Sequence, residues 1–347
     1  MRLLEQEGCT ITDEWAYKGM RVIWLENSYL RIGILPDRGS DIFEFRYKPL
    51  DINLLLNLPG RLRNLNTDFS QMRDTKSQFE DHYYGGWQEI LPNGPALTYR
   101  RASLGQHGEV SLIPWKYSIL NTSENEVSVR LTGTPVRFPI SIEKTISLKR
   151  GDNNITISEK LTNQSNTDLD LMWGQHIALG TSFVEDELEI ETNATQMISE
   201  PGMPDKRKFK PGIQTEWPRA IALNGSKVDA SIFSSRGKEV YSELSYLNEF
   251  RDTATAKGTY SVINKAQKIS FNVSWDADIF KCLWMWQERE AMQGFPWWGN
   301  CYTLALEPWT SKWTNDPEGA INRGEWLKLA EGQEISTSIS AGITEIQ

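Results

Sequence analysis

The chain has 347 residues, of which 39% are hydrophobic and 24% charged, and its formal net charge is −9. This composition is typical of a globular protein and excludes long disordered or collagen-like segments. The negative charge disfavours nucleic acid and anionic membranes as partners, and no stretch approaches the ~20 apolar residues of a membrane-spanning helix.

The first predicted elements form a hairpin. Residues 29–35 alternate apolar and other side chains, as a half-buried strand does, and residues 42–45 resume the pattern. Between them, Pro36-Asp37-Arg38-Gly39 interrupts the strand pattern and predicts a polar bend.

Five short apolar runs follow in the middle of the chain, separated by turn clusters rich in Gly, Asn, Asp and Ser. Their spacing of about ten residues is typical of an antiparallel sandwich or barrel. The runs are 116–120, 126–131, 140–148, 154–162 and 169–176. Further strands are predicted at 231–233, 269–275, 280–286, 303–307 and 335–343.

Helical signals are weak. Residues 65–81 are polar without a strong 3.6-residue period, so we expect at most one short helix there. Residues 197–218 carry several Gly and Pro residues and predict a long loop. No linker divides the chain, so we expect one all-β domain over residues 1–347 with few short helices.

Aromatic residues are abundant and histidines are scarce: 14 Trp, 11 Tyr and 12 Phe stand against 3 His. Sugars present flat CH faces that stack on indole rings, so this excess of tryptophan indicates a carbohydrate site. The three cysteines are odd in number and show no Cys-x-x-Cys spacing, which predicts reduced thiols without a disulfide framework or a zinc site. We expect no metal and no cofactor.

Two histidines are candidates for chemistry. His107 lies between glycines in Gly105-Gln106-His107-Gly108-Glu109, where a structural role and a binding role are equally plausible. His176 ends the run 169–176, and an imidazole suits proton transfer near neutral pH, although a structural histidine at a strand end fits the same position.

A carboxylate is the third candidate. Glu307 stands inside the apolar run Leu304-Ala305-Leu306 before Pro308, where a charge is costly unless it is paired or used. A salt bridge to an arginine is the alternative interpretation. Six tryptophans fall within thirty residues around Glu307 and favour a site carboxylate: Trp284, Trp286, Trp297, Trp298, Trp309 and Trp313.

Other residues are weaker candidates. Arg38 sits in the early bend and either contacts sugar hydroxyls or lies in a plain surface turn. Trp87 follows a glycine pair that would let backbone approach a ligand, and His82 precedes that turn.

The order of Arg38, His107, His176 and Leu306-Glu307-Pro308 resembles the aldose 1-epimerase (galactose mutarotase-like) family, as a divergent branch. The resemblance implies one large antiparallel β-supersandwich with a shallow sugar cleft. It implies Glu307 as general base and His176 as general acid. His107, Arg38, Trp87, Glu109, Trp286 and His82 are the expected substrate-binding residues. The family's acidic residue that binds sugar hydroxyls has no evident counterpart.

The resemblance implies interconversion of the α and β anomers of a free sugar or sugar derivative by acid–base ring opening. A non-catalytic carbohydrate-binding module of the same fold is the alternative from another class. A sugar-phosphate epimerase is a variant that needs cations at the cleft, which the basic run 206–210 would supply if it folds over the site. A lyase or hydrolase is a third alternative, but hydrolysis normally needs two carboxylates, with Glu89 and Glu109 as distant candidates for the second.

We expect a small-molecule sugar as the partner. The sequence leaves open whether the protein forms a homodimer. The N-terminus lacks the continuous apolar core of a signal peptide, because Glu5 and Glu7 interrupt it. The expected location is therefore cytoplasmic.

Overall fold

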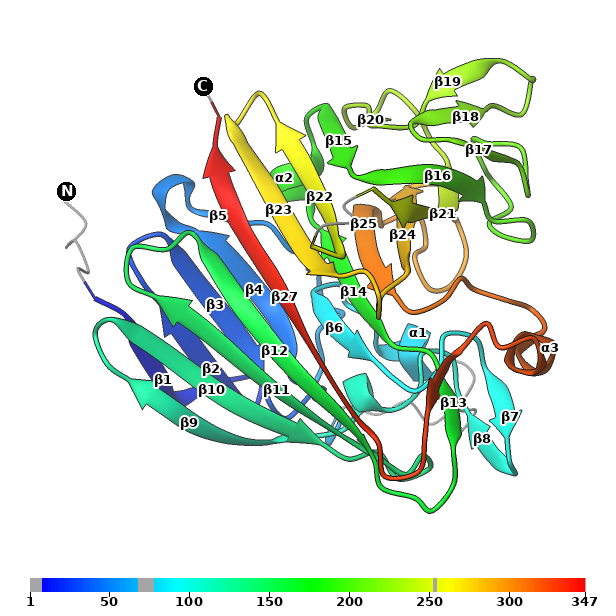
Figure 1. Cartoon of the computed structure of the whole chain (residues 1–347). Coiled ribbons are helices and arrows are strands. Elements are labelled where there is room, and N and C mark those ends of the chain that lie inside the picture. Colours follow the sequence, from blue (N-terminus) through cyan, green and yellow to red (C-terminus); the bar gives the residue numbers. More distant parts are fainter. Residues whose placement is uncertain (1–7, 68–77, 252–254, 347) are drawn as a thin grey trace.

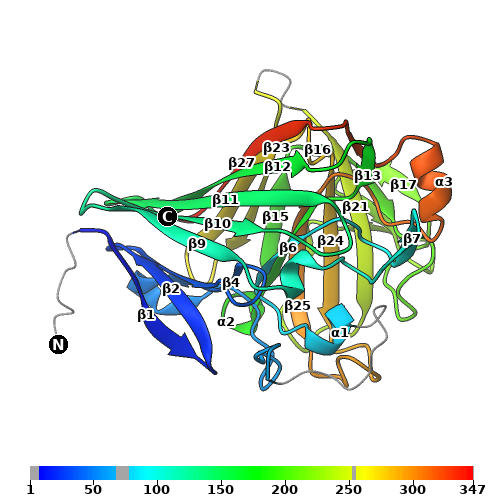
Figure 2. The ribbon, with the colours of Figure 1, turned by 90° about the horizontal axis from the view of Figure 1, so that it is seen from below.

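The computed structural model describes residues 8–67, 78–251 and 255–346. Two large antiparallel sheets lie face to face over a shared core, as Figures 1 and 2 show from two directions. The all-β sandwich that the sequence predicts is therefore confirmed.

The larger sheet has twelve strands in the order β1-β2-β3-β4-β6-β14-β25-β24-β21-β16-β17, with β5 paired to β4. Its strands are β1 (Thr10–Tyr17), β2 (Met20–Glu26), β3 (Leu30–Leu35), β4 (Asp41–Tyr47), β5 (Ile52–Asn53), β6 (Trp87–Ile90), β14 (Gly174–Leu179), β16 (Ala194–Ser199), β17 (Gln214–Glu216), β21 (Ser242–Phe250), β24 (Cys282–Arg289) and β25 (Tyr302–Trp309).

The second sheet has nine strands in the order β20-β15-β22-β23-β27-β12-β11-β10-β9. They are β9 (Lys116–Thr122), β10 (Glu126–Gly133), β11 (Ile140–Lys149), β12 (Asn154–Asn163), β15 (Leu188–Thr192), β20 (Ile232–Phe233), β22 (Lys257–Asn264), β23 (Ile269–Asp276) and β27 (Glu334–Glu345). Three two-stranded sheets complete the strands: β7 (Leu97–Tyr99) with β8 (Ala102–Leu104), β13 (Leu169–Leu171) with β26 (Leu327–Leu329), and β18 (Arg219–Ile221) with β19 (Lys227–Asp229).

Helices are few and short among the described residues. They are α1 (Gln78–His82), α2 (Thr181–Val184), α3 (Pro317–Asn322) and the 3-10 turns Lys48–Leu50 and Val110–Leu112. Helix α1 overlaps the end of the region 65–81 where one short helix is expected, and residues 68–77 of that region lie outside the described residues. In the described part of the chain, no helix is long and apolar enough to cross a membrane.

Alternation along the strands divides the twelve-stranded sheet into two faces. On β25, Leu304 and Leu306 pack into the core between the sheets, while Ala305 and Trp309 belong to a separate cluster on the outer face. Successive side chains of a strand point to opposite faces, so Glu307 also faces outward. The outer face carries the candidate site.

Most predicted strands are present, but one is divided. Residues 169–176 form two strands, because Met172 and Trp173 separate β13 from β14. Strand β13 pairs with β26 outside the large sheets, whereas β14 lies between β6 and β25. His176 is therefore in the middle of a central strand and not at a strand end.

Candidate active site

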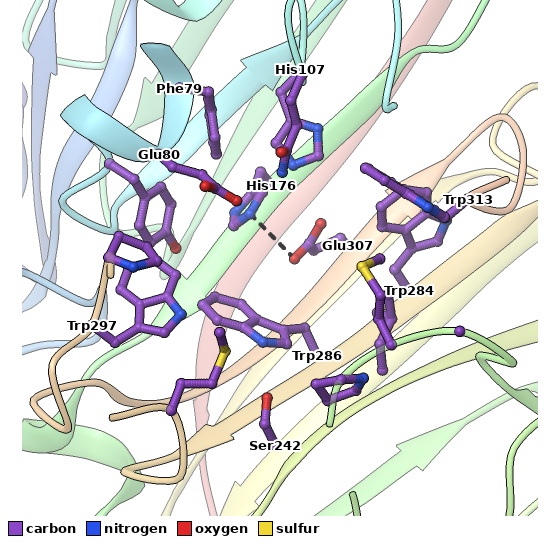
Figure 3. Close-up of a pocket in the computed structure, with 18 of the residues that line it drawn as sticks. Phe79, Glu80, His107, His176, Ser242, Trp284, Trp286, Trp297, Glu307 and Trp313 are labelled. Carbon is purple, nitrogen blue, oxygen red and sulfur yellow. Dashed lines mark ion pairs between the residues drawn. The ribbon is translucent and has the colours of Figure 1, made fainter. Parts of the chain in front are cut away.

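A cavity of about 390 Å³ opens on the outer face of the twelve-stranded sheet, over β14, β24 and β25. Figure 3 shows its side chains directed toward a common centre. We call it the cleft. The residues that line it are Phe79, Glu80, Tyr83, Gln106, His107, His176, Gly202, Met203, Pro204, Asp205, Ser242, Leu244, Trp284, Trp286, Met292, Pro296, Trp297, Glu307 and Trp313.

Glu307 and His176 face each other across neighbouring strands on the floor of the cleft. The pairing of Gly174 with Trp309 and of Ala178 with Ala305 sets the register that places them together. His176 Nε2 lies 3.6 Å from Glu307 Oε1, and the two side chains are only 7% and 2% exposed. They form a close, buried pair of titratable groups (Figure 3).

Burial shapes the protonation of both groups. It raises the pKa of Glu307 to about 8, although the Trp309 indole N–H, 2.9 Å from Glu307 Oε2, opposes the shift. Burial lowers the pKa of His176 to about 3. Each group therefore favours its uncharged form. Near neutral pH the pair holds one proton, which rests on Glu307 in the empty cleft.

His107 stands beside this pair from a different part of the chain. Its ring centroid is 5.7 Å from that of His176, and Phe79 packs edge-on against it at 4.4 Å. Burial, and then the neighbouring His176, lower the pKa of His107 well below its usual value. A neutral imidazole here can donate to or accept from a sugar hydroxyl.

The glycine after His107 has a packing role. A Cβ on Gly108 would lie 2.0 Å from the carbonyl oxygen of Leu91, and Gly108 has a φ of +67°. Only glycine allows this close approach of two backbone segments. The glycine therefore fixes the His107 loop against the strand end.

Tryptophans form the walls. Trp284 lines the cleft and stacks on Trp309, which is fully buried behind it, with ring centroids 4.0 Å apart and planes 11° from parallel. Trp286 lies against Trp297 at 5.6 Å on the opposite side of the floor (Figure 3). Such flat aromatic surfaces suit the CH faces of a sugar ring.

Helix α1 and the residue that follows it bring to the cleft two side chains that sequence reasoning missed. Glu80 directs its carboxylate into the cleft (Figure 3), and burial raises its pKa while a hydrogen bond with Gln106 opposes the shift. Tyr83 lines the same wall, and its buried hydroxyl has no partner among the described residues. Both precede the Gly-Gly-Trp turn, but no periodicity or spacing in this polar segment marks them.

Four predicted binding residues lie outside the cleft. Arg38 is fully buried and donates to the backbone carbonyls of Arg63 and His82, beside the Asp41 carboxylate. Trp87 faces the core and donates to Gln175.

His82 and Glu109 complete these four. The His82 side chain is buried away from the cleft, and burial lowers its pKa. Glu109 accepts from the backbone N–H groups of Val136 and Arg137 and lines a separate cavity. Glu307, His176, His107 and Trp286 are the predicted residues that the fold brings together.

The residues just before the basic run 206–210 line the cleft, but the charged side chains of the run do not. Gly202 to Asp205 line the cleft, whereas Arg207 turns back onto the carbonyls of Glu200, Met203 and Pro204. Lys208 pairs with Glu239 at 2.9 Å. The described residues that line the cleft therefore include carboxylates and no lysine or arginine.

Solved structures share this architecture. A protein from Klebsiella pneumoniae, provisionally assigned as an aldose 1-epimerase, superposes with a TM-score of 0.75 at 14% identity, over 97% of this chain and 83% of that one. A galactose mutarotase-like protein from Clostridium acetobutylicum matches with a TM-score of 0.64 at 14% identity, over 98% and 99%. The fold is thus galactose mutarotase-like.

The sequence itself matches the profile of a domain of unknown function, DUF4432, over residues 17–343, and the chain belongs to that family. No curated protein matches the sequence. The predicted resemblance to a divergent branch of the galactose mutarotase-like proteins is confirmed at the level of the fold.

Proposed function

We propose that this protein interconverts the α and β anomers of a free, uncharged sugar. The observation that carries the proposal is the buried Glu307–His176 pair on the floor of a tryptophan-walled cleft. The pair offers one proton donor and one acceptor within reach of a single ring, which is what reversible ring opening requires.

The reaction starts when the proton of the pair is on His176. Glu307 takes the proton from the anomeric hydroxyl O1, while His176 gives its proton to the ring oxygen O5. The C1–O5 bond breaks and its electron pair stays on O5, as C1 and O1 form the aldehyde double bond. After rotation about C1–C2, O5 attacks the other face of C1; His176 takes its proton back from O5, and Glu307 returns the other proton to O1.

The residues around the Glu307–His176 pair support a negative charge on Glu307 during the reaction and offer hydrogen bonds to the sugar. The Trp309 indole N–H already contacts Glu307 Oε2 and stabilises the carboxylate. The unpartnered Tyr83 hydroxyl and the neutral His107 ring offer hydrogen bonds to sugar hydroxyls. The absence of cations among the described residues of the cleft favours an uncharged sugar over a phosphorylated or acidic one.

The direct test follows anomer exchange of free hexoses by NMR, with glucose 6-phosphate and glucuronate beside them. We expect catalysed exchange of a free hexose and weaker exchange of both anionic sugars. Binding of a hexose in calorimetry without any rate enhancement would contradict catalysis and favour a binding module.

Replacing His176 by Asn should lower the exchange rate by ~10²–10⁴-fold, the usual contribution of one positioned proton-transfer group. Asn keeps a side-chain amide near the ring position but cannot deliver the proton. Calorimetry on the same variant should retain hexose binding. An unchanged exchange rate would remove His176 from the mechanism.

The exchange rate should also fall as pH rises above about 8. Burial raises the pKa of Glu307 to about 8 and lowers that of His176 to about 3, so the pair keeps one proton between these values and none above them. Without that proton, the pair has no acid that can protonate the ring oxygen O5. The measurement is the NMR exchange rate from pH 5 to 10 after subtraction of the uncatalysed rate; a plateau up to pH 10 would contradict the one-proton pair.

A further inference from the structure

A second cavity of about 610 Å³ adjoins the cleft and shares Pro296 and Trp297 with it. Its other walls come from residues 56–61, next to β5, and from the loop between β24 and β25. The reaction proposed above uses none of these residues apart from the shared wall. The two cavities are therefore neighbours on either side of one aromatic residue.

The loop that carries this wall, residues 291–300, is closed at its base. Glu290 N–H donates to Cys301 O at 2.9 Å, and Gly299 N–H donates to Met292 O at 2.8 Å. The buried Glu288 carboxylate accepts from the backbone N–H groups of Ala291 and Met292. These bonds tie down the base of the loop that carries Trp297 and the next residue, Trp298.

Trp298 lines the second cavity and is 64% exposed. Its neighbour Trp297 is instead covered by Trp286 and Tyr83. An exposed indole on an anchored loop beside a cavity offers an unoccupied flat surface, and sugar rings stack on such surfaces.

Both arginines that line the second cavity already have hydrogen-bond or ion-pair partners. Arg61 donates through Nε and Nη2 to the carbonyls of Tyr83 and Glu80, and Arg236 pairs with Glu290 and Glu185. Asn57 and Asn300 add amide groups to the lining. A wall of amides, arginines whose donors already have partners and one open indole suits a polyhydroxyl group.

We propose that the second cavity binds the next sugar unit of a reducing oligosaccharide whose reducing-end ring lies in the cleft. This inference rests on the proposed function, which puts the anomeric carbon at Glu307 and His176 on the floor. The opposite side of that ring can then face Trp297, which lines both the cleft and the second cavity. A glycosidic bond on that side passes over Trp297 and leads the next unit to Trp298.

The test compares the specificity constants for anomer exchange of reducing disaccharides (maltose, cellobiose and lactose) with those of glucose and galactose. The wild type should prefer at least one disaccharide over its reducing-end monosaccharide. Trp298→Ala should reduce that preference about tenfold, as expected for the loss of one aromatic surface. Trp15→Ala is a matched control, because Trp15 is 63% exposed on β1 and lines neither cavity.

Two results would overturn the subsite: no disaccharide is preferred, or the preference survives Trp298→Ala unchanged. Calorimetry with the same disaccharides separates this failure from failure of the proposed function. Disaccharide binding that weakens in Trp298→Ala, without catalysed exchange in the wild type, would support the subsite and contradict catalysis. Exchange of monosaccharides with no effect of Trp298→Ala on disaccharides would support catalysis and contradict the subsite.

Discussion

The Glu307→Gln variant should lose anomer exchange by ~10²–10⁴-fold while it still binds sugar. Gln has nearly the same shape as Glu and keeps an oxygen for the Trp309 indole N–H, which lies 2.9 Å from the carboxylate in the wild type. It cannot take the proton of the anomeric hydroxyl. NMR exchange gives the rate and calorimetry gives the affinity, so the two effects are read separately.

The same variant should be more stable than the wild type at alkaline pH. Burial raises the pKa of Glu307 to about 8, so the folded protein holds this proton more tightly than the unfolded chain does. The stabilisation by the proton is complete below the unfolded pKa of about 4.5 and is lost as pH rises through about 8. Gln carries no such proton, and the variant should gain up to about 5 kcal/mol by pH 9, because each unit of pKa shift corresponds to about 1.4 kcal/mol.

Thermal unfolding at pH 5 and pH 9 measures this gain, which should appear only at the higher pH. The control is Glu331→Gln, which removes one exposed carboxylate outside the cleft and should change neither exchange nor the pH dependence. A Glu307→Gln variant with full exchange activity would contradict its role as base. Equal melting temperatures at pH 9 would contradict the raised pKa.

Replacing Lys144 by Met should destabilise the fold by about 3–5 kcal/mol, the cost of leaving a buried charge without its partner. Lys144 on β11 lies with its Nζ 3.0 Å from Glu89 Oε2 on β6, and both side chains are almost fully buried. Urea unfolding monitored by tryptophan fluorescence measures the loss, which should appear as a lower midpoint.

The cost is high because Glu89 belongs to a polar cluster between the two sheets. Its Oε1 accepts from Trp173 and from Gln175, whose amide also lies 3.1 Å from Glu159 Oε2. Burial, and then the Glu89 charge, raise the pKa of Glu159 well above its usual value. The cluster therefore balances one cation against one carboxylate and one carboxylic acid, and removal of Lys144 leaves it with no cation.

Glu159→Gln is the matched control. It imitates the protonated carboxyl at the same buried place and should change stability by less than about 1 kcal/mol. The double variant Lys144→Met with Glu89→Gln removes both members of the pair and should regain most of the stability. A Lys144→Met variant within about 1 kcal/mol of the wild type would show that the Lys144–Glu89 pair is not needed.

Local patterns in the sequence predicted many strands of both large sheets but missed others, among them β1, β2, β21 and β22. The alternation in residues 269–275 and 335–343 appears in the neighbouring strands β23 and β27. The hairpin over residues 29–45 forms β3 and β4. The same patterns did not divide residues 169–176, because the break at Met172 and Trp173 depends on β13 pairing with β26, far away in the sequence. A period of two says which side chains share a face, but not which strand lies alongside.

The residues of the candidate site could also be predicted only in part, because local patterns do not reveal contacts between distant segments. Residue type and context identified Glu307, His176 and His107, and the cluster of tryptophans indicated the walls. Arg38 was expected at the sugar, yet the fold uses its guanidinium to bind two backbone carbonyls. Glu80 was missed because its place in the cleft comes from the position of helix α1 beside the cleft, which no spacing in its own segment reveals.

The sequence by itself determined the class of fold and the groups available for proton transfer, because strand alternation and the cost of a buried carboxylate are local properties. Only the tertiary structure decided that Glu307 and His176 form one pair. Antiparallel pairing of β14 with β25 joins residues more than a hundred positions apart, and this register sets the distance of 3.6 Å. It also decided that Gln175 faces the core and His176 the cleft, because adjacent residues of one strand point to opposite faces of its sheet.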